Sequence, residues 1–430
     1  MMMFDIFLSI IVSSSPRKIF DLQSQHPMLS PKEVMYNIAS SCEDFNIRNF
    51  DVYGDFELET SSSFLRKFES EVAEVFGKED AVFMPSGTMA QQIALLIHSQ
   101  KNAGKDGRSE IPLRRFACHH TSHLLLWEKD SYRELTGFQA IEISTAHKAN
   151  RKGLNIPAMS LSDVENMFLN EKERMLPKRE PLGDTGLSTL IMELPHRELG
   201  GKLPEFQEVE KIGMICKMEG ISYHCDGARI FEASAGYGKS LQDVAAPFDS
   251  VYISFYKGLG GLAGSMLMGD KQFCQEARIW LRRFGGNLFT LLPFIISSYV
   301  GFRRHVLGNG STMYFDEKLQ KMRRVTKRIL SETDFDSVGA FDPPIPHTNM
   351  IHVYFKFSVV ECEAARDHVL DSHYIQVFRR IRQVDDNHKL LKEAGYGAYI
   401  EWTMGEANGI LEDEVFVEGW LHFIEALQKK

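Results

Sequence analysis

The sequence lacks the features that mark several large classes of protein. Its six cysteines are scattered along the chain and form no Cys-x-x-Cys, which indicates free thiols in a reducing compartment rather than a disulfide framework or a structural zinc site. It contains no long basic block, and its formal net charge is −9 at pH 7. Because binding to nucleic-acid phosphates needs clustered basic surface, we expect no nucleic-acid partner.

The amino terminus lacks the pattern of a signal peptide or of a membrane anchor. Residues 1–12 are apolar, but Asp5 interrupts them, no basic stretch precedes them and no small-residue cleavage site follows them. This run is also much shorter than the roughly 20 apolar residues that span a bilayer. We therefore expect a cytoplasmic protein with no membrane partner, in which residues 1–45 form a leader and one helix.

What the sequence does contain is an ordinary globular composition, with 43% hydrophobic and 25% charged residues. Its length suggests about two or three domains. Apolar strand-like runs alternate with helix-like segments through most of the chain, which predicts an α/β domain with a mostly parallel sheet at residues 46–312. The later segments include a charged helix and a proline-rich turn, and they predict a smaller α+β domain at residues 313–430.

Two charged residues each follow an apolar run that reads as a buried strand. Asp226 follows residues 220–225, and Lys257, 31 positions later (257 − 226), follows residues 248–255. Both side chains are expected at the carboxyl edge of the sheet, where open α/β sheets bind their ligands. Pyridoxal 5'-phosphate needs such a pair, because a lysine forms a Schiff base with its aldehyde and an acid holds its pyridine nitrogen protonated. A structural ion pair is the alternative that these two residues leave open.

The turn Pro85-Ser86-Gly87-Thr88-Met89 joins a predicted strand at residues 81–84 to a predicted helix at residues 90–98. The free N–H groups and dipole of a helix amino terminus, together with the Ser86 and Thr88 hydroxyls, are suited to an anion such as phosphate. An ordinary helix N-cap is the alternative, since serine and threonine are common there. The turn is not a Walker P-loop, because it lacks the Gly-Lys-Ser/Thr of that motif.

Three histidines lie within five positions, at His119, His120 and His123. His119 and His123 would share one face of a helix, which suits a metal ion, but no carboxylate or cysteine completes a ligand set at a recognisable spacing. We therefore expect no metal site. Stacking of a neutral histidine on a cofactor ring is the favoured hypothesis, and a buried core histidine is the alternative.

Taken in order, these motifs resemble those of the threonine aldolase family of fold-type I pyridoxal-phosphate lyases. The resemblance extends over about residues 46–355, and the matching stretches are Asp51-Val52-Tyr53-Gly54, residues 68–77, Pro85-Ser86-Gly87-Thr88-Met89, Ser122-His123 with Glu128, Asp226-Gly227-Ala228-Arg229, Lys257-Gly258-Leu259-Gly260 and Thr348-Asn349-Met350. It implies a fold-type I transferase-like fold and a lyase that cleaves threonine or allo-threonine to glycine and acetaldehyde by retro-aldol chemistry. Threonine catabolism and glycine biosynthesis are the corresponding pathways.

The resemblance also implies partners and residue roles. The partner would be a small amino-acid substrate, and the chain would form a homodimer or homotetramer in which Tyr53 reaches across the interface. Lys257 would bond to the aldehyde of pyridoxal phosphate, Asp226 would hold its pyridine nitrogen and Arg229 would lie beside its phenolic edge. The residues that would bind its phosphate are Ser86, Gly87 and Thr88.

His123 carries two implied roles, because it would stack on the cofactor ring and is the candidate base for the hydroxyl proton of the substrate. His196 matches a family histidine that follows a strand-end glutamate, although the usual Asn-Thr before it reads Leu194-Pro195 here. The catalytic residues are therefore predicted to be Lys257, His123 and Asp226.

The sequence departs from the family at the expected substrate end. The late strand that normally supplies an arginine for the substrate carboxylate reads Tyr399-Ile400-Glu401-Trp402-Thr403-Met404, without an arginine, and the residues considered as substitutes are Arg379, Arg380 and Arg382. The amino-terminal Arg-Ser-Asp-Thr of the family has no counterpart in residues 16–45. Two alternatives therefore stay open, a lyase that eliminates the β-substituent of another amino acid and a protein that binds the cofactor without catalysis.

Overall fold

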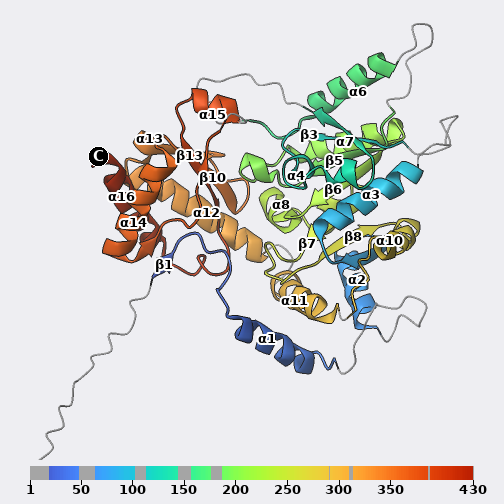
Figure 1. Cartoon of the computed structure of the whole chain (residues 1–430), viewed down its shortest axis with the longest axis horizontal. Helices are drawn as coiled ribbons and strands as arrows, with labels where there is room; N and C mark the ends of the chain where they lie inside the picture. The colour runs from blue at the N-terminus through green and yellow to red at the C-terminus, as the bar shows by residue number, and fades with distance from the viewer. Residues whose placement is uncertain are drawn as a thin grey trace, which may run out of the picture.

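The computed structural model describes residues 19–47, 63–101, 113–143, 156–175, 186–289, 291–308, 313–385 and 388–429. Figure 1 shows a larger α/β part and, coloured orange to red, a smaller part formed by the later residues. The early strand β1 (Phe20–Asp21) pairs in parallel with β11 (Ile375–Gln376), so the start of the described chain lies against the smaller part. Helix α1 (Pro31–Asp44) follows and is capped by Ser30, as its Ser-Pro start indicates.

A seven-stranded sheet organises the larger part. Its strands, in spatial order, are β2 (Asp80–Met84), β8 (Ser265–Gly269), β7 (Ser250–Ser254), β6 (Ser222–Gly227), β5 (Thr189–Glu193), β3 (Arg115–His119) and β4 (Gln139–Ile143). Strand β8 is antiparallel to both of its neighbours, and the other pairings are parallel. The predicted mostly parallel α/β sheet is therefore confirmed.

Helices cover both faces of this sheet. Side chains alternate between the two faces along each strand, so a strand that is apolar throughout needs a helix layer on each side. One face packs against α3 (Gly87–Lys101) and α10 (Lys271–Arg283) through apolar residues such as Val82, Tyr252 and Leu267. The helices that contribute to the core on the other face are α2 (Phe64–Val75), α6 (Leu161–Met175), α7 (Phe206–Met218), α8 (Ile230–Tyr237), α9 (Leu241–Ala245) and α11 (Leu292–Phe302). Both faces of the strands are thus buried, which explains their continuous apolar runs.

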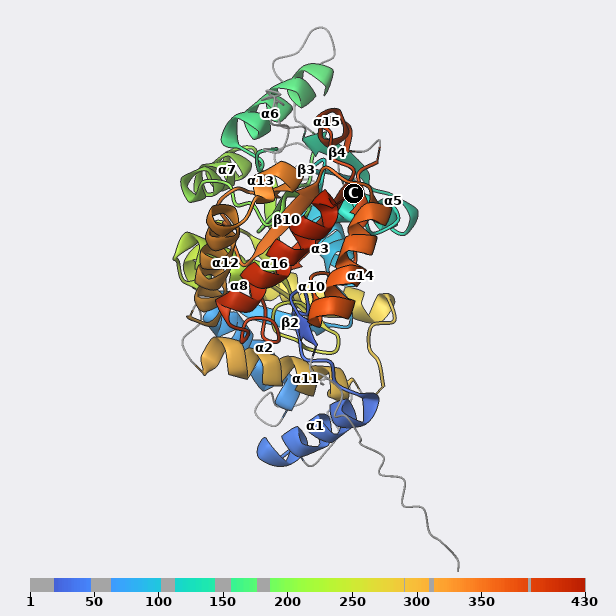
Figure 2. The ribbon, with the colours of Figure 1, turned by 90° about the vertical axis from the view of Figure 1, so that its left-hand side faces the viewer.

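The smaller part has a four-stranded antiparallel sheet. Its strands, in spatial order, are β12 (Arg382–Gln383), β13 (Ala398–Thr403), β10 (Met350–Phe355) and β9 (Gly339–Asp342), and its helices are α12 (Met313–Glu332), α13 (Phe335–Val338), α14 (Val359–His373), α15 (Lys389–Glu393) and α16 (Asp413–Gln428). Figure 2 shows α16 between α12 and α14, and the buried Trp402 and Trp420 lie in their shared core. This confirms the predicted α+β character.

The structure also bears on the predictions about the helix after the phosphate turn, the cysteines and membrane spans. The helix expected at residues 90–98 begins earlier, at Gly87, and ends later, at Lys101. All six cysteines are free thiols. Among the described residues, no helix combines the length and the hydrophobicity needed to cross a bilayer.

Candidate active site

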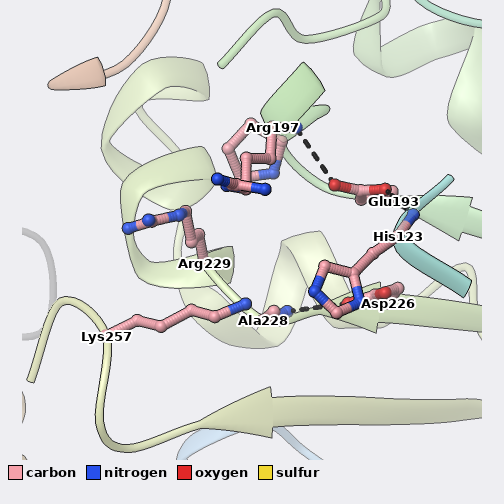
Figure 3. A pocket seen from close by; sticks show the side chains of 8 residues that line it. His123, Glu193, Arg197, Asp226, Ala228, Arg229 and Lys257 are labelled. Atoms are coloured by element: carbon pink, nitrogen blue, oxygen red, sulfur yellow. Dashed lines mark hydrogen bonds between the residues drawn. The ribbon is translucent and has the colours of Figure 1, made fainter. Parts of the chain in front are cut away.

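A cavity opens where the carboxyl ends of β3, β5, β6 and β7 meet, and Figure 3 shows the side chains around it. The empty space within it and at its mouth, open solvent included, amounts to about 240 Å³. The residues that line it are His123, Glu193, Pro195, Arg197, Asp226, Ala228, Arg229 and Lys257. Four of the seven predicted site residues are therefore brought together, from the segment after β3, the end of β6 with the turn that follows it, and the loop after β7.

Asp226 and Lys257 occupy neighbouring strand ends. Asp226 lies in β6, only 2% exposed, and its Oδ1 accepts the Ala228 N–H at 3.2 Å. Lys257 follows β7, and Figure 3 shows its amine directed into the cavity toward Ala228. Burial raises the pKa of Asp226, while the charges of Lys257 and His123 oppose that rise. Burial lowers the pKa of Lys257 and the Arg229 charge lowers it further, so its amine is more easily neutral and nucleophilic.

His123 begins the short helix α4 (His123–Leu126), and its ring lies beside Asp226 in Figure 3. Its Nδ1 is 3.1 Å from Glu128 Oε1. Burial alone would lower the pKa of His123, but the hydrogen bond to Glu128 and the Asp226 charge outweigh it and the pKa is raised. With the proton of Nδ1 held by Glu128, Nε2 is left to accept a proton. The geometry therefore suits His123 to act as a base.

Glu193 joins two loops at the back of the cavity. Its carboxylate accepts the backbone N–H of His123 at 3.2 Å and that of Arg197 at 3.0 Å. Burial and the nearby Asp226 charge raise the pKa of Glu193 to about 7. One buried carboxylate thus holds the start of α4 and the loop after β5 in a fixed relation.

Arg197 and Glu401 were not selected by the sequence analysis as site residues. Arg197 lies in the 3₁₀ turn Arg197–Leu199 after β5, and its Nη2 is 2.7 Å from Glu401 Oε2 of β13. Arg229 approaches the other oxygen of Glu401 at 3.5 Å. Burial raises the pKa of Glu401, but Arg197 and Arg229 outweigh it and hold the pKa at about 2. The signal that could have revealed this group was the presence of an acid, Glu401, on the late strand that was expected to supply an arginine.

The three arginines considered as substitutes do not line this cavity. Arg379 pairs with Asp21 and is exposed, and Arg380 is exposed as well. Arg382 borders a second, larger cavity, where its guanidinium is 5.1 Å from the centre of the Trp127 ring.

The predicted phosphate turn lies at the same edge of the sheet. Met84 at the end of β2 pairs with Ser265, which also pairs with Ser254 at the end of β7, so the start of α3 is two strands from the Lys257 loop. Ser86 Oγ accepts the Met89 N–H at 3.3 Å, the bond of an ordinary N-cap. A Cβ on Gly87 would lie 2.0 Å from Tyr252 Oη, so the close approach of this turn to the sheet requires glycine.

His119 and His123 do not share the helix face on which the disfavoured metal interpretation depended. His119 ends β3 rather than lying on a helix, and its ring is 4.9 Å from that of His196. Burial lowers the pKa of His196 to about 3, and neither of its ring nitrogens has a hydrogen-bond partner among the described residues. No group of three or more metal-binding side chains occurs within the described ranges. His119 and His196 are thus buried behind the cavity, as the core-histidine alternative proposed.

The amino-terminal segment makes one contact that sequence reasoning missed. His26 Nε2 is 2.7 Å from the backbone oxygen of Lys257. The motif at residues 51–54, with Tyr53, lies outside the described residues. The contact of His26 nevertheless shows that a segment without the family's amino-terminal motif reaches the lysine loop.

The site fits the predicted cofactor. A buried acid and a lysine with a lowered pKa face one cavity, and the amino terminus of α3 supplies anion-binding N–H groups at the same edge. Arg229 Nε and Nη1 are buried and form no hydrogen bond to any described residue, so they are available to an anionic or phenolic ligand.

Comparisons with known proteins agree with this site. The model of the beta-eliminating lyase family matches residues 51–357. A solved "putative L-allo-threonine aldolase" from Listeria monocytogenes is 31% identical, with a TM-score of 0.74 over 95% of this chain and 96% of that chain. A solved "putative aromatic amino acid beta-eliminating lyase/threonine aldolase" from Exiguobacterium sp. 255-15 is 29% identical, with a TM-score of 0.73 over 95% and 97%.

Curated relatives match over a shorter stretch. The "Probable low-specificity L-threonine aldolase 2" of Arabidopsis thaliana is 31% identical over 244 residues, which are 56% of this chain and 61% of the relative. The matched region thus spans less than two thirds of that relative's length. The architecture is that of fold-type I pyridoxal-phosphate enzymes, as predicted.

Proposed function

This chain belongs to the beta-eliminating lyase family, and we propose that it is a pyridoxal-phosphate-dependent lyase that cleaves threonine or allo-threonine to glycine and acetaldehyde. The observation that carries the proposal is the meeting of Asp226, Lys257 and His123 on one cavity at adjacent strand ends. The names of the relatives support the substrate class. The substrate itself and its stereochemistry belong to the proposal.

Seven residues would hold the cofactor: Lys257 at its aldehyde, Asp226 at its ring nitrogen, Arg229 beside its phenolic edge, His123 on its ring, and Ser86, Gly87 and Thr88 around its phosphate. When bound, pyridoxal phosphate supplies an aldehyde that reacts with amines and a ring that accepts the electron pair released at Cα. Asp226 is placed to hold a proton on a nitrogen that faces it. Lys257 offers an amine whose lowered pKa favours the neutral, nucleophilic form.

His123 would take the proton from the β-hydroxyl of the substrate. Glu128 holds its Nδ1, so the free Nε2 accepts the proton and the resulting positive charge is stabilised by the Glu128 carboxylate. The backbone of His123 is fixed by Glu193, which keeps the ring in place while the proton moves. The base is thus oriented from two sides.

A lyase that eliminates another β-substituent is the second candidate, because the late strand expected to supply the carboxylate-binding arginine has none and carries Glu401. A cofactor-binding protein without catalysis is disfavoured, since the acid, the lysine and the histidine are all retained at one cavity. Three further predictions stay with the proposal: a homodimer or homotetramer, a cytoplasmic location, and a division into residues 46–312 and 313–430. The separate sheets of the two parts support that division.

The test is product analysis with purified protein supplied with pyridoxal phosphate. L-threonine, L-allo-threonine and phenylserine should each give glycine and the matching aldehyde in equal amounts. Release of a keto acid and ammonia from cysteine or tyrosine, without aldehyde from threonine, would favour the elimination reaction instead. A protein that acquires the visible absorbance of the bound cofactor but converts none of these amino acids would support binding without catalysis.

A further inference from the structure

We propose that Arg197, positioned by Glu401, binds the carboxylate of the amino-acid substrate. This inference rests on the proposed function and identifies a residue for it. Arg197 and Arg229 both line the cavity that contains the Lys257 amine, whereas Arg379, Arg380 and Arg382 lie outside it. In Figure 3 the guanidinium of Arg197 lies on the opposite side of the cavity from Lys257 and close to that of Arg229.

Arginines and acids are paired at this end of the cavity. Two arginines share one carboxylate, because Glu401 is 2.7 Å from Arg197 and 3.5 Å from Arg229. With its pKa held at about 2, Glu401 is ionised and offsets one of the two positive charges. Burial raises the pKa of the other nearby acid, Glu232, to about 7, so this acid is partly protonated near neutral pH. Glu198 pairs with Arg197 as well, at 2.8 Å, so the acids already offset most of the positive charge, and a ligand carboxylate would bind through the N–H donors that remain rather than through excess charge.

Unused donors point to the same conclusion. Arg229 Nε and Nη1 are buried without a hydrogen-bond partner among the described residues, and the ion-pair partner of Nη1, Glu232 Oε1, is 3.7 Å away. Arg197 uses its Nη2 for Glu401 and its Nη1 for Glu198 at 2.8 Å, which leaves other N–H groups of its five free for a ligand. Buried donors of this kind are nearly always satisfied, so a ligand with several acceptor oxygens is expected beside them.

Arg197 is held rigidly enough to serve as a binding residue. Its backbone N–H is bonded to Glu193, and its guanidinium lies 5.3 Å from the centre of the Trp127 ring, whose Nε1 donates to Glu198 at 2.7 Å. Glu401 reaches it from the smaller part and holds the outer nitrogen. A guanidinium oriented in advance loses less entropy when it binds a carboxylate.

The inference also accounts for strand β13, which carries Glu401 and no arginine. An acid in place of the expected arginine would by itself repel a substrate carboxylate. Here Glu401 forms an ion pair with Arg197 of the loop after β5. The arginine at the substrate end is therefore supplied by that loop and not by the late strand. The substrate end therefore keeps a positive group although the late strand carries a negative one.

The test compares glycine with glycinamide, which lacks the carboxylate charge. Neither ligand has a Cα–Cβ bond to cleave, so binding is measured without turnover, by the visible absorbance of the cofactor-loaded protein and by the rise in its melting temperature. The wild type should prefer glycine. Arg197→Gln should weaken glycine binding about 10- to 100-fold, the loss expected for a charge-assisted hydrogen-bonded pair, and leave glycinamide binding nearly unchanged. The glycine affinity of Arg197→Lys should lie between those of the wild type and of Arg197→Gln.

A matched control is Arg115→Gln. Arg115 is paired with Glu171 and is 15% exposed in its side chain, similar to the 17% of Arg197, but it begins β3 at the opposite edge of the sheet. This variant should retain the preference for glycine. If Arg197→Gln keeps the cofactor and the full preference for glycine, the inference is wrong.

Exchanging the two charges tests Glu401. Arg197→Glu should abolish the preference for glycine, and addition of Glu401→Arg should restore part of it, because an arginine then faces the same space from β13. A double variant that binds the cofactor but prefers glycine no more than Arg197→Glu does would refute the pairing of the two residues at this subsite. The proposed lyase function is refuted by a different result, namely that the wild type binds glycine but releases no aldehyde from any substrate.

Discussion

The two ends of the cavity are assembled in different ways. Asp226 and Lys257 come from β6 and from the loop after β7, which are neighbouring strands of one sheet. Arg197 and Arg229 come from loops of the larger part, but Glu401 comes from β13 of the smaller sheet. Strand pairing within one sheet is enough to place Asp226 and Lys257. The group of Arg197, Arg229 and Glu401 forms only if the two sheets also pack against each other in a fixed orientation.

The contacts between the two parts show what this packing requires. Lys202 and Asp342 form a buried ion pair of 2.7 Å between the loop after β5 and β9. A Cβ on Gly200, which has a φ of +67°, would lie 2.1 Å from the Asp342 backbone oxygen. The substrate end is thus expected to be the more sensitive to changes far from the cavity.

Removing the lysine should have the largest effect. Lys257→Ala is expected to lower turnover by at least about 1,000-fold, because no other amine in the cavity can take its role as nucleophile. Aldehyde release and the visible absorbance of the cofactor measure the loss. Lys101→Ala, at an exposed ion pair with Asp270, should keep both. Intact turnover in the Lys257 variant would contradict the assignment of that end of the cavity.

Breaking the Lys202–Asp342 contact between the two parts should affect substrate binding and leave cofactor binding unchanged. Lys202→Met leaves the Asp342 carboxylate buried without its partner and should cost about 3–5 kcal/mol of unfolding free energy, measured by urea denaturation. In the folded variant, glycine binding should weaken while the cofactor absorbance stays.

The double variant Lys202→Met with Asp342→Leu is the matched control, since it removes both charges and should recover most of the stability. If Lys202→Met weakens cofactor binding and glycine binding equally, the two ends of the cavity do not depend on separate contacts.

Stability should depend on pH through Glu232, next to Arg229. Burial raises its pKa from 4.5 to about 7, so the folded protein holds this proton more tightly than the unfolded chain. Stability from this group is therefore present below about pH 4.5 and is lost as the pH rises through about 7, a change of about 3 kcal/mol. Glu232→Gln should remove that loss, and unfolding curves across this range would show it. A difference between the two proteins that does not vary with pH would contradict the assignment.

The smallest expected effect concerns the base. Because Glu128 raises the pKa of His123, and the neutral histidine is the active form, wild-type activity should rise as the pH rises through this raised pKa. Glu128→Gln should move that acidic limb of the kcat/KM profile to lower pH, with at most about a tenfold change in rate at neutral pH. Glu134→Gln, at an exposed site, should leave the profile in place. An unshifted limb would exclude His123 as the titrating base.

Much of the first end of the cavity could be predicted because its determinants are local in sequence. An apolar run that ends in a charged residue places that residue at a strand end, and parallel strands bring their ends to one edge. The helix face that His119 and His123 would have needed for the disfavoured metal interpretation does not form, since β3 continues through His119 and α4 begins only at His123. Periodicity over so few residues does not separate a strand end from a helix start.

The amino-acid sequence by itself determined the alternating strands and helices, the acid and the lysine at adjacent strand ends, and the glycine at residue 87 that lets α3 approach the sheet. Only the tertiary structure decided that Arg197 meets Glu401, 204 residues away (401 − 197), and that Arg382 lines a different cavity. Strand order and side-chain alternation follow from short-range patterns of hydrophobicity. Which charges meet between two separate sheets depends on how their cores pack, and no local pattern encodes that.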